Sequence, residues 1–270
     1  MKHVLTIAGS DSSGGAGIQA DLKTFSALGV YGMSVITAIT AQNTLGVQAV
    51  EDVSPTLVEA QLNSIFSDIR VDAVKIGMVS NEKTIQVIAK CLKHYKGPVV
   101  LDPVMVAKGG HALLKEHAEQ ALMEHLMPLA TVTTPNIPEM ERMLGQAIST
   151  VDEMKLATTE FAQKRDIAIL LKGGHLESID ASDILYTEGM YHLFQEARLK
   201  RQHTHGTGCT LSSAIAARLA LGDSLKDSVI YAKRYVTEAI RHGFALGNGI
   251  GPTHHFYDIW RETDAYNHSR

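Results

Sequence analysis

Short apolar runs alternate with longer amphipathic runs along most of this 270-residue chain, and this alternation constrains the fold more than any other feature. Short apolar runs bounded by turns are typical of buried parallel strands, and the amphipathic runs between them are typical of covering helices. The predicted strands are residues 4–8, 33–38, 73–76, 99–101, 131–133 and 167–171. The pattern therefore predicts an α/β fold with a mostly parallel central sheet flanked by helices.

The amphipathic runs agree with this layout, because their apolar residues recur at helical spacing. One stripe after Pro55 consists of Leu57, Val58, Leu62, Ile65 and Ile69, and a second consists of Ile85, Ile88, Ala89 and Leu92. Between 183 and 198, two short strand-like pieces flank Glu188 and Gly189, which predicts a hairpin at the edge of the sheet. Without a repeat or a long linker, the chain is expected to form one three-layer α/β/α domain over residues 1–270.

Charge and cysteine content exclude several classes of protein. The net charge is -4, from 25 basic and 29 acidic residues spread without blocks, so we expect no nucleic-acid-binding face and no membrane-surface helix. No apolar run approaches the ~20 residues that a membrane span requires. The two cysteines, Cys91 and Cys209, give neither a disulfide framework nor paired metal-ligand spacing. The amino terminus reads as a strand and a glycine turn rather than a signal peptide, and we expect a cytoplasmic enzyme.

The segment His205-Gly206-Thr207-Gly208-Cys209-Thr210 opens a predicted helix. A helix begins with unpaired backbone N–H groups at the positive end of its dipole, and glycines let that backbone approach a phosphate closely. The same field favours a thiolate at Cys209 in the first turn. The alternative interpretation is a glycine-rich turn beside a buried cysteine.

The loop at 9–17 lies between a predicted strand and a predicted helix, which is where open α/β sheets bind ligands. Its glycines match neither the dinucleotide-binding fingerprint nor the P-loop. On the helix that follows, Asp21 falls inside an apolar stripe, where a carboxylate is costly unless it is paired. The stripe consists of Ile18, Leu22, Phe25 and Leu28. Asp21 either points into a ligand pocket beneath the loop, or lies at the edge of the stripe, where it reaches water or caps nearby N–H groups.

Further polar residues follow predicted strands. Gln42 is expected at a strand's carboxyl end, where its amide could bind a heteroaromatic ring edge that carries an amino group and a ring nitrogen, or simply face solvent. Asn136 and Glu139 could both face a hydrated Mg²⁺, or form a helix-capping box. Lys172 directly follows an apolar strand and could meet nucleotide phosphates, or serve only solubility.

Two features of the carboxyl-terminal part are weaker indications of a functional site. Lys233 lies beside the apolar stripe of the predicted helix 225–240, so it either serves a site or extends along apolar surface toward water. His254 and His255 are adjacent, and adjacent side chains of a strand point in opposite directions, which disfavours a metal site there.

Several motifs together resemble one known family. They are AGSDSSGGAGIQADLKTF, TAQNT, KIGM (75–78), LDPVM (101–105), TPNIPE, LKGGH (171–175), THGTGCT (204–210) and GIGPTHHF (249–256). Their order and spacing resemble the hydroxymethylpyrimidine/phosphomethylpyrimidine kinases of thiamine biosynthesis, within the ribokinase-like superfamily. The resemblance runs from about Leu5 to Trp260. One branch of related pyridoxal kinases shares the first loop and the GxGC turn but departs around AQNT, which this chain retains.

The resemblance implies an ATP-dependent kinase that phosphorylates 4-amino-5-hydroxymethyl-2-methylpyrimidine and then its monophosphate. Its implied partners are that pyrimidine and ATP with Mg²⁺, with a monovalent cation left open, and a homodimer fits the family. The implied catalytic residues are Asp21, Gly206, Gly208, Cys209 and Lys233, with Cys209 where other ribokinase relatives carry an aspartate base. The implied substrate-binding residues are Gly9, Asp21, Gln42, Met78 and Val106. The implied nucleotide-binding residues are Asp102, Asn136, Lys172, Thr207 and Gly208, with Glu139 acting on Mg·ATP indirectly.

Two other functions are compatible with parts of this sequence. A kinase of B6 vitamers would use the same machinery with a different ring. A ligand-binding regulator would keep the fold without turnover, but the intact GTGC turn, the Asn136 and Glu139 pair and Lys233 argue against it, because a sensor needs no phosphoryl-transfer site.

Overall fold

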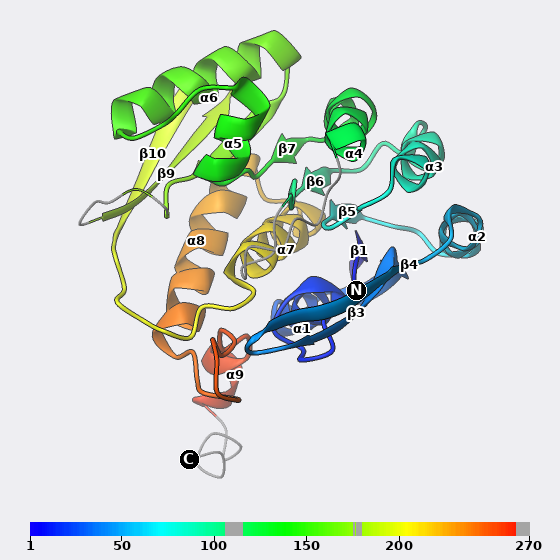
Figure 1. The fold of residues 1–270 in the computed structure, drawn as a ribbon, viewed down its shortest axis with the longest axis horizontal. Coiled ribbons are helices and arrows are strands. Elements are labelled where there is room, and N and C mark those ends of the chain that lie inside the picture. The colour runs from blue at the N-terminus through cyan, green and yellow to red at the C-terminus, as the bar shows by residue number, and fades with distance from the viewer. Residues whose placement is uncertain (106–115, 175, 177–179, 263–270) are drawn as a thin grey trace.

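The computed structural model describes residues 1–105, 116–174, 176 and 180–262. Within this part, an eight-stranded sheet has the order β10-β9-β8-β7-β6-β5-β1-β2 (Figure 1). Pairing is parallel from β2 through β8, and β9 and β10 are antiparallel additions at the edge. The strands are β1 (His3–Ala8), β2 (Tyr31–Ile36), β5 (Ala73–Ile76), β6 (Val99–Leu101), β7 (Val132–Thr133), β8 (Ala168–Lys172), β9 (Asp180–Thr187) and β10 (Met190–Ala197). The mostly parallel α/β fold predicted from the alternating pattern is confirmed.

Helices cover both faces of this sheet (Figure 1). One face carries α1 (Gly17–Ala27), α7 (Thr207–Leu221) and α8 (Leu225–Arg241). The other carries α2 (Pro55–Phe66), α3 (Glu82–Leu92), α4 (Glu116–Ala121), the π-helical turn η1 (Leu122–Leu126), the 3₁₀ turn η2 (Met127–Leu129), α5 (Ile137–Leu144) and α6 (Val151–Arg165). A short helix α9 (Tyr257–Trp260) lies near the carboxyl terminus. Among the residues described, no helix combines the length and apolar character that crossing a membrane requires.

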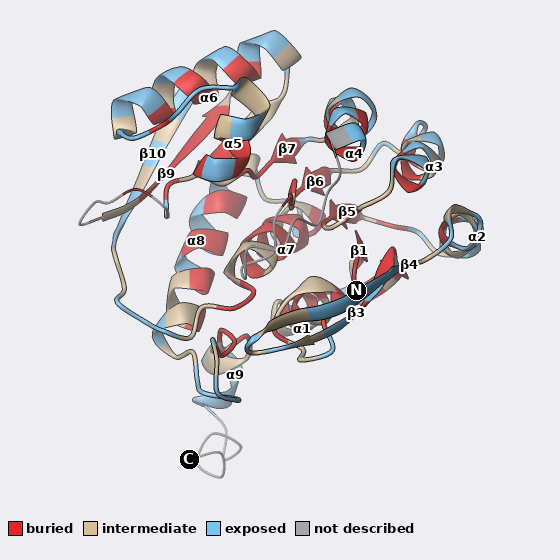
Figure 2. Ribbon diagram, in the orientation of Figure 1, coloured by how far each residue is buried: buried red, intermediate tan, exposed pale blue. Residues whose placement is uncertain are grey.

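The strands have two buried faces, so their side chains divide into two cores. In β1, Val4 belongs to the core under α7 and α8, and Leu5 belongs to the core under α2 and α3. Ala73 and Val74 of β5 divide in the same way. Because successive side chains of a strand point to opposite faces, a strand covered on both sides is mostly apolar, and its buried polar side chains need partners. Figure 2 shows the resulting buried centre, with exposed residues on the outer helix surfaces.

A second, two-stranded sheet consists of β3 (Ala38–Asn43) and β4 (Gly46–Asp52), paired antiparallel. The sequence predicts Gln42 at the carboxyl end of the strand over 33–38, whereas in the structure Gln42 lies near the carboxyl end of a separate strand, β3. The chain instead continues into β3 and reverses at Thr44 and Leu45, so Gln42 lies within a strand, next to a bulge. Nearly all of β4 is exposed or half-buried, so its residues lack the apolar pattern that identified the central strands.

The hairpin expected around Glu188 and Gly189 is confirmed as β9 and β10. Both turn residues have positive φ, 52° for Glu188 and 77° for Gly189. This is the geometry of a two-residue turn whose twist matches that of the flanking strands. The hairpin extends the sheet beyond β8 on the side where α6 and α8 lie (Figure 1).

Helix α2 begins with Ser54, whose side chain accepts a hydrogen bond from the Leu57 backbone N–H, followed by Pro55. The sequence analysis placed Leu57 on the same apolar face as Leu62. In the structure Leu62 is fully buried, whereas Leu57 is 55% exposed. The helix therefore presents a narrower apolar face than the sequence pattern suggested.

We expect Leu62→Ala to lower the free energy of unfolding by about 2–5 kcal/mol, because it removes buried methyl groups and leaves a cavity. The matched variant Leu57→Ala removes the same atoms from the surface of the same helix and is expected to change stability by less than about 0.5 kcal/mol. Denaturant unfolding of both variants measures the difference. Equal losses would mean that α2 packs in another rotation.

Candidate active site

The candidate site lies at one edge of the sheet, where the parallel strands end. The loop after β1 and the residues that follow β6, β7 and β8 meet there, because parallel strands place their carboxyl ends on one side. The amino-terminal turn of α7 approaches the same edge, and α7 contacts β1, β5 and β6. Polar side chains that are far apart in sequence therefore gather around the start of one helix.

The turn that opens α7 is built on backbone contact with the first loop (9–17). Gly206 has a φ of 81°, and a Cβ at this position would lie 1.7 Å from the Gly15 carbonyl oxygen. Only glycine fits both the left-handed conformation and this close approach. At Gly208, a Cβ would lie 3.5 Å from Lys172 Nζ and 3.6 Å from Asp102 Oδ2, so this glycine faces an ion pair. The Thr207 N–H donates to the Thr204 carbonyl at 3.4 Å, whereas the N–H groups of Gly208 and Cys209 have no acceptor within the helix and can face an anion.

A buried ion pair lies beneath this turn. Lys75 Nζ donates to both carboxylate oxygens of Asp21 at 2.9 Å, and both side chains are completely buried. The hydroxyls of Thr6 and Ser213 each donate to Asp21 at 2.6 Å. Burial lowers the pKa of Lys75, but the negative charges of Asp21, Cys209 and Asp102 and the hydrogen bond to Asp21 together raise it above its ordinary value, so the lysine is charged. The alternative that Asp21 reaches water is wrong, and its neutralising partner, Lys75, was not found from the sequence.

A second ion pair joins two strand ends. Lys172, the last residue of β8, donates to Asp102 Oδ1 at 2.9 Å, and Thr134 Oγ1 donates to the same oxygen at 3.0 Å. Ser212 of α7 contacts Asp102 Oδ2 at 3.3 Å. Burial would raise the pKa of Asp102, but Lys172 and Lys75 lower it below its ordinary value. Lys172 therefore faces the start of α7 rather than open solvent, as its proposed nucleotide role requires.

Asn136 and Glu139 form a capping box at the start of α5. Asn136 Oδ1 accepts from the Glu139 N–H at 2.9 Å, and Glu139 Oε2 accepts from the Asn136 N–H at 2.8 Å. The capping interpretation is therefore confirmed. Glu139 is also buried close to Lys172 and Asp102, and burial raises its pKa to about 7 despite the attraction of Lys172. Because this pKa lies near neutral pH, a cation or a phosphate bound at this edge would change the protonation state of Glu139.

The thiol of Cys209 differs from the expectation. The helix dipole predicted a thiolate, but burial, together with the charges of Asp21 and Asp102, raises the pKa of Cys209 to about 11. Lys75 and a hydrogen bond from the Gly17 N–H lower the pKa, without offsetting burial. In the unliganded protein Cys209 is therefore a neutral thiol near neutral pH, and the expectation of a resting thiolate is wrong.

Gln42 reaches the site from the β3–β4 hairpin. Its backbone exchanges two hydrogen bonds with the Ser12 hydroxyl, so the hairpin is fixed to the first loop. Its side-chain Nε2 lies 3.2 Å from Nε2 of His205, which in turn lies 2.8 Å from Oδ2 of Asp11. His205 and Asp11 were not predicted as site residues, although both lie within the glycine-rich segments 205–210 and 9–17.

The remaining predicted residues have varied placements. Gly9 packs against Met78, since a Cβ at Gly9 would lie 2.5 Å from the Met78 methyl group. Thr207 is the first residue of α7, and its hydroxyl donates to the Thr204 carbonyl at 2.7 Å. Val106 lies outside the described residues.

Lys233 is directed to another partner. It lies on α8 and donates to Asp183 Oδ2 at 2.6 Å and to the Ala181 carbonyl at 3.0 Å, both on β9. Asp183 Oδ1 accepts from the Gly173 N–H, one residue after Lys172. Lys233 is therefore separated from the Asp21 and Lys75 pair and supports the strand end that carries Lys172. A direct catalytic role for Lys233 stays a prediction.

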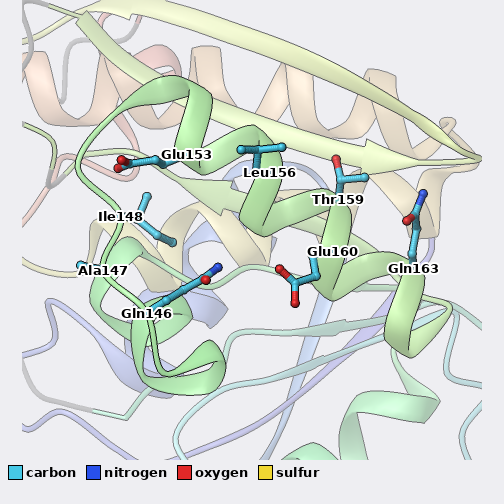
Figure 3. Close-up of a pocket in the computed structure, with 8 residues that line it drawn as sticks. All are labelled: Gln146, Ala147, Ile148, Glu153, Leu156, Thr159, Glu160 and Gln163. Atoms are coloured by element: carbon cyan, nitrogen blue, oxygen red, sulfur yellow. The ribbon is translucent and has the colours of Figure 1, made fainter.

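Two open hollows on the described surface lie away from the candidate site. One hollow of about 510 Å³ lies along the outer side of α6, lined by Gln146, Ala147, Ile148, Glu153, Leu156, Thr159, Glu160 and Gln163 (Figure 3). A similar hollow of about 530 Å³ lies around Asp166 and Gly189. Neither contains a residue of the candidate site, so the polar convergence at the strand ends, rather than hollow size, identifies the site.

The described residues contain no cluster of three or more His, Cys, Asp or Glu side chains that could hold a metal ion. His255, one of the adjacent histidines, is buried, and its ring contacts Thr210 Oγ1 at 3.1 Å. Burial lowers the pKa of His255 to about 3. His255 thus packs against α7, whereas the His254 ring packs against the rings of Phe244, Tyr257 and Trp260.

A family model for phosphomethylpyrimidine kinase matches residues 11–254. The chain belongs to the phosphomethylpyrimidine kinase family. It is 53% identical to the hydroxymethylpyrimidine/phosphomethylpyrimidine kinase of Rhizobium meliloti (strain 1021), covering 96% of this chain and 98% of the relative. It is 45% identical to the enzyme of that name from Escherichia coli (strain K12), covering 96% and 100%. Members of this family are phosphotransferases, which confirms the enzyme class predicted from the motifs.

Solved structures agree with this assignment. The crystal structure of phosphomethylpyrimidine kinase from Clostridium difficile 630 is 50% identical, with a TM-score of 0.79 over 89% of this chain and 100% of that chain. An ADP complex of Bacillus subtilis pyridoxal kinase is 41% identical, with a TM-score of 0.88 over 94% and 97%. The ribokinase-like fold expected from the resemblance is confirmed.

We expect Lys75→Met to lower the free energy of unfolding by about 3–5 kcal/mol, because it leaves the Asp21 carboxylate buried without a counter-charge. Combining it with Asp21→Asn should restore part of this loss, since the uncompensated charge is then absent. The exposed pair of Lys90 and Glu59 supplies the control, and Lys90→Met should change stability far less, because water screens the charges of this pair. Denaturant unfolding of the single and double variants measures the coupling. Additive losses would contradict a direct interaction.

We expect iodoacetamide to modify Cys209 of the unliganded protein about 10²-fold more slowly near neutral pH than an unperturbed cysteine, because only the thiolate reacts. A raised pKa means that the thiolate fraction is small at neutral pH and grows as pH rises toward about 11. The rate should therefore increase about tenfold per pH unit up to that region. Mass spectrometry follows the modification, with Cys209→Ser to assign it. A rate that levels off below about pH 8 would contradict the raised pKa.

Proposed function

We propose that this protein is an ATP-dependent kinase that phosphorylates 4-amino-5-hydroxymethyl-2-methylpyrimidine and then the monophosphate product. The observation that carries the proposal is the convergence of the glycine turn of α7 with the Lys172 and Asp102 pair at the strand ends. This arrangement supplies backbone donors and a cation side by side, as transfer of a phosphoryl group requires. The names of the relatives support the pyrimidine as the acceptor.

The site has little covalent work to do, because phosphoryl transfer depends mainly on alignment and charge stabilisation. The N–H groups of Gly206, Gly208 and Cys209 would face charge that develops on the transferring group. Lys172 would meet nucleotide phosphate, and its pairing with Asp102 keeps it extended and charged. The Asp21 and Lys75 pair lies directly below and holds this end of α7 through Ser213.

Mg²⁺ is proposed to enter with ATP. Mg²⁺ retains water and usually takes one or two carboxylates together with substrate phosphates, and the described residues offer no protein cage. The Glu139 carboxyl group, with its pKa near 7 beside Lys172 and Asp102, fits that limited role. Bound Mg²⁺ would neutralise phosphate charge, while Glu139 and Asp102 would orient the complex.

A B6-vitamer kinase remains the second candidate, because pyridoxal kinases are among the similar structures. One from Staphylococcus aureus, solved with AMP-PCP and pyridoxal, is 35% identical with a TM-score of 0.88 over 96% of each chain. The pyrimidine kinases reach 53% identity, which favours the first candidate. ATP use is supported by the pyridoxal kinases that were solved with ADP and with AMP-PCP. We also propose, from the similarity to these kinases, that the protein is cytoplasmic and forms a homodimer.

The test compares the pyrimidine alcohol, its monophosphate and pyridoxal as acceptors in ATP-dependent product formation. We expect kcat/KM for the pyrimidine alcohol to exceed that for pyridoxal by at least ~10-fold, because one unmatched buried polar contact costs roughly 1.4 kcal/mol or more. Omitting Mg²⁺ should abolish turnover of all three. Equal or better use of pyridoxal would replace the assignment with the B6 kinase.

Cys209→Ala separates two roles of this residue, because it removes the thiol and leaves the backbone N–H in place. We expect kcat to fall by about 10²-fold, the usual scale for a positioned proton-transfer group. With a resting pKa of about 11, the thiol can serve as a base only if the loaded site stabilises its anion. If the alanine variant keeps most of its kcat, catalysis rests on the backbone donors and on Lys172, and the kinase assignment is unaffected.

A further inference from the structure

Lys75 of β5 is a cation buried beneath the start of α7, and its side chain has no exposed surface. Among the described residues, its ammonium group donates to Asp21 alone, through two hydrogen bonds, although it carries three N–H groups. A Cβ at Gly77 would lie 2.8 Å from Lys75 Nζ, so the ammonium occupies space that only a glycine leaves open. A buried cation of this kind favours a further negative charge close to it.

Helices α1 and α7 bring the Cys209 thiol next to this ion pair. The Ser213 hydroxyl donates to Asp21 Oδ1 at 2.6 Å, and Cys209 lies one turn before Ser213 on the same face of α7. Gly17 lies one turn before Asp21 on α1, and its N–H donates to the Cys209 thiol. The two helices are thus joined at two successive turns, with the thiol at the first turn and the Asp21 and Lys75 pair at the second.

Charged groups from four elements act on the Cys209 thiol. They are Lys75 on β5, Asp21 on α1, Asp102 after β6 and Lys172 at the end of β8. Burial is the largest cause of the raised pKa of Cys209; among the charges, Lys75 has the strongest effect and lowers the pKa, whereas Asp21 and Asp102 raise it. Lys172 is paired with Asp102. The balance between Lys75 and Asp21 therefore dominates the electrostatic part of the thiol's acidity.

We propose that Lys75 is a positioning residue that acts through Cys209: its ammonium group stabilises the Cys209 thiolate, and Asp21 restrains this effect in the unliganded protein. Asp21 then has two consequences, because the carboxylate that holds Lys75 in place also offsets its charge. The inference deepens the proposed function, and it rests on that function only where Cys209 is taken as the group that accepts a proton during phosphoryl transfer.

The test measures alkylation of Cys209 by iodoacetamide between about pH 7 and 10, without substrates. In Asp21→Asn the ammonium loses its paired carboxylate, and its remaining counter-charges come from Asp102 and from Cys209 itself as a thiolate. We expect the pH at which the thiol ionises to fall by about one pH unit or more, the usual effect of a nearby charge. The rate near pH 8 should rise by about 3–10-fold, because the larger thiolate fraction outweighs the lower nucleophilicity of a more acidic thiol.

The double variant Asp21→Asn/Lys75→Met removes the ammonium as well, and we expect its rate to return to within about 3-fold of the wild-type rate. Comparing the single and double variants isolates Lys75 in proteins that contain no unpaired Asp21 carboxylate. Asp21→Asn/Lys75→Arg keeps the positive charge and should remain as fast as Asp21→Asn. If the methionine variant fails to fold, Lys75→Gln replaces Lys75→Met, because its amide can form a hydrogen bond to the amide at position 21.

Two controls separate charge from packing. Ser213→Ala removes a hydrogen bond to Asp21 and leaves both charges in place, so it should change the rate by less than about 3-fold. Cys91 on α3 is a half-buried thiol in every variant, and its rate, followed by mass spectrometry of the same samples, should stay constant. Thermal unfolding shows that each variant is folded.

Loosened packing around α7 would expose the thiol and speed alkylation in every variant, including the double one. That result, or a rate in Asp21→Asn that does not exceed the wild-type rate, would overturn the inference. Kinase activity is assayed separately, because the alkylation series requires no turnover. If the wild-type protein fails to phosphorylate the pyrimidine alcohol, the proposed function fails, while the series still decides whether Lys75 acts on Cys209.

Discussion

The buried ion pair of Asp21 and Lys75 is the interaction on which the arrangement of the site depends. Through Thr6 and Ser213 the same carboxylate connects β1 and α7 to α1 and β5. Each of these elements ends or begins at the candidate site, so a single buried charge pair sets their relative positions. Such pairs are weak sources of net stability, since desolvation offsets much of their attraction. The value of this one lies in the position that it gives to the first turn of α7.

Charge in the site is balanced before any ligand binds. Asp102 neutralises Lys172, Asp21 neutralises Lys75, and Cys209 remains a neutral thiol because burial opposes its ionisation. A nucleotide that brings negative charge with Mg²⁺ would enter a site that is polar but not strongly charged. The backbone N–H groups at the start of α7 that lack an acceptor within the helix could then donate to the nucleotide without first losing another hydrogen bond.

The sequence predicted the central sheet well, because strands buried on both faces leave a strong local pattern, and 73–76 and 99–101 agree with the structure to the residue. Asp21 was also identified, since a carboxylate within an apolar stripe is visible locally. Its partner was not, because the parallel pairing of β1 with β5 brings Lys75 beneath α1 across more than fifty residues. The thiol of Cys209 was misjudged because the helix field can be deduced from sequence, whereas burial depends on tertiary packing.

The contact between Gly15 and Gly206 has a consequence for how this protein can change. With one backbone seated directly on the other, neither segment has room to vary alone, because a Cβ on Gly206 would meet the Gly15 carbonyl oxygen. Replacing the first loop with that of a relative would preserve this backbone contact only if the turn of α7 were replaced together with it. The first loop and the turn of α7 are almost two hundred residues apart in sequence, but they can change only together. Substitutions designed to alter which acceptor substrate is phosphorylated therefore have more freedom in the β3–β4 hairpin than in either of these segments.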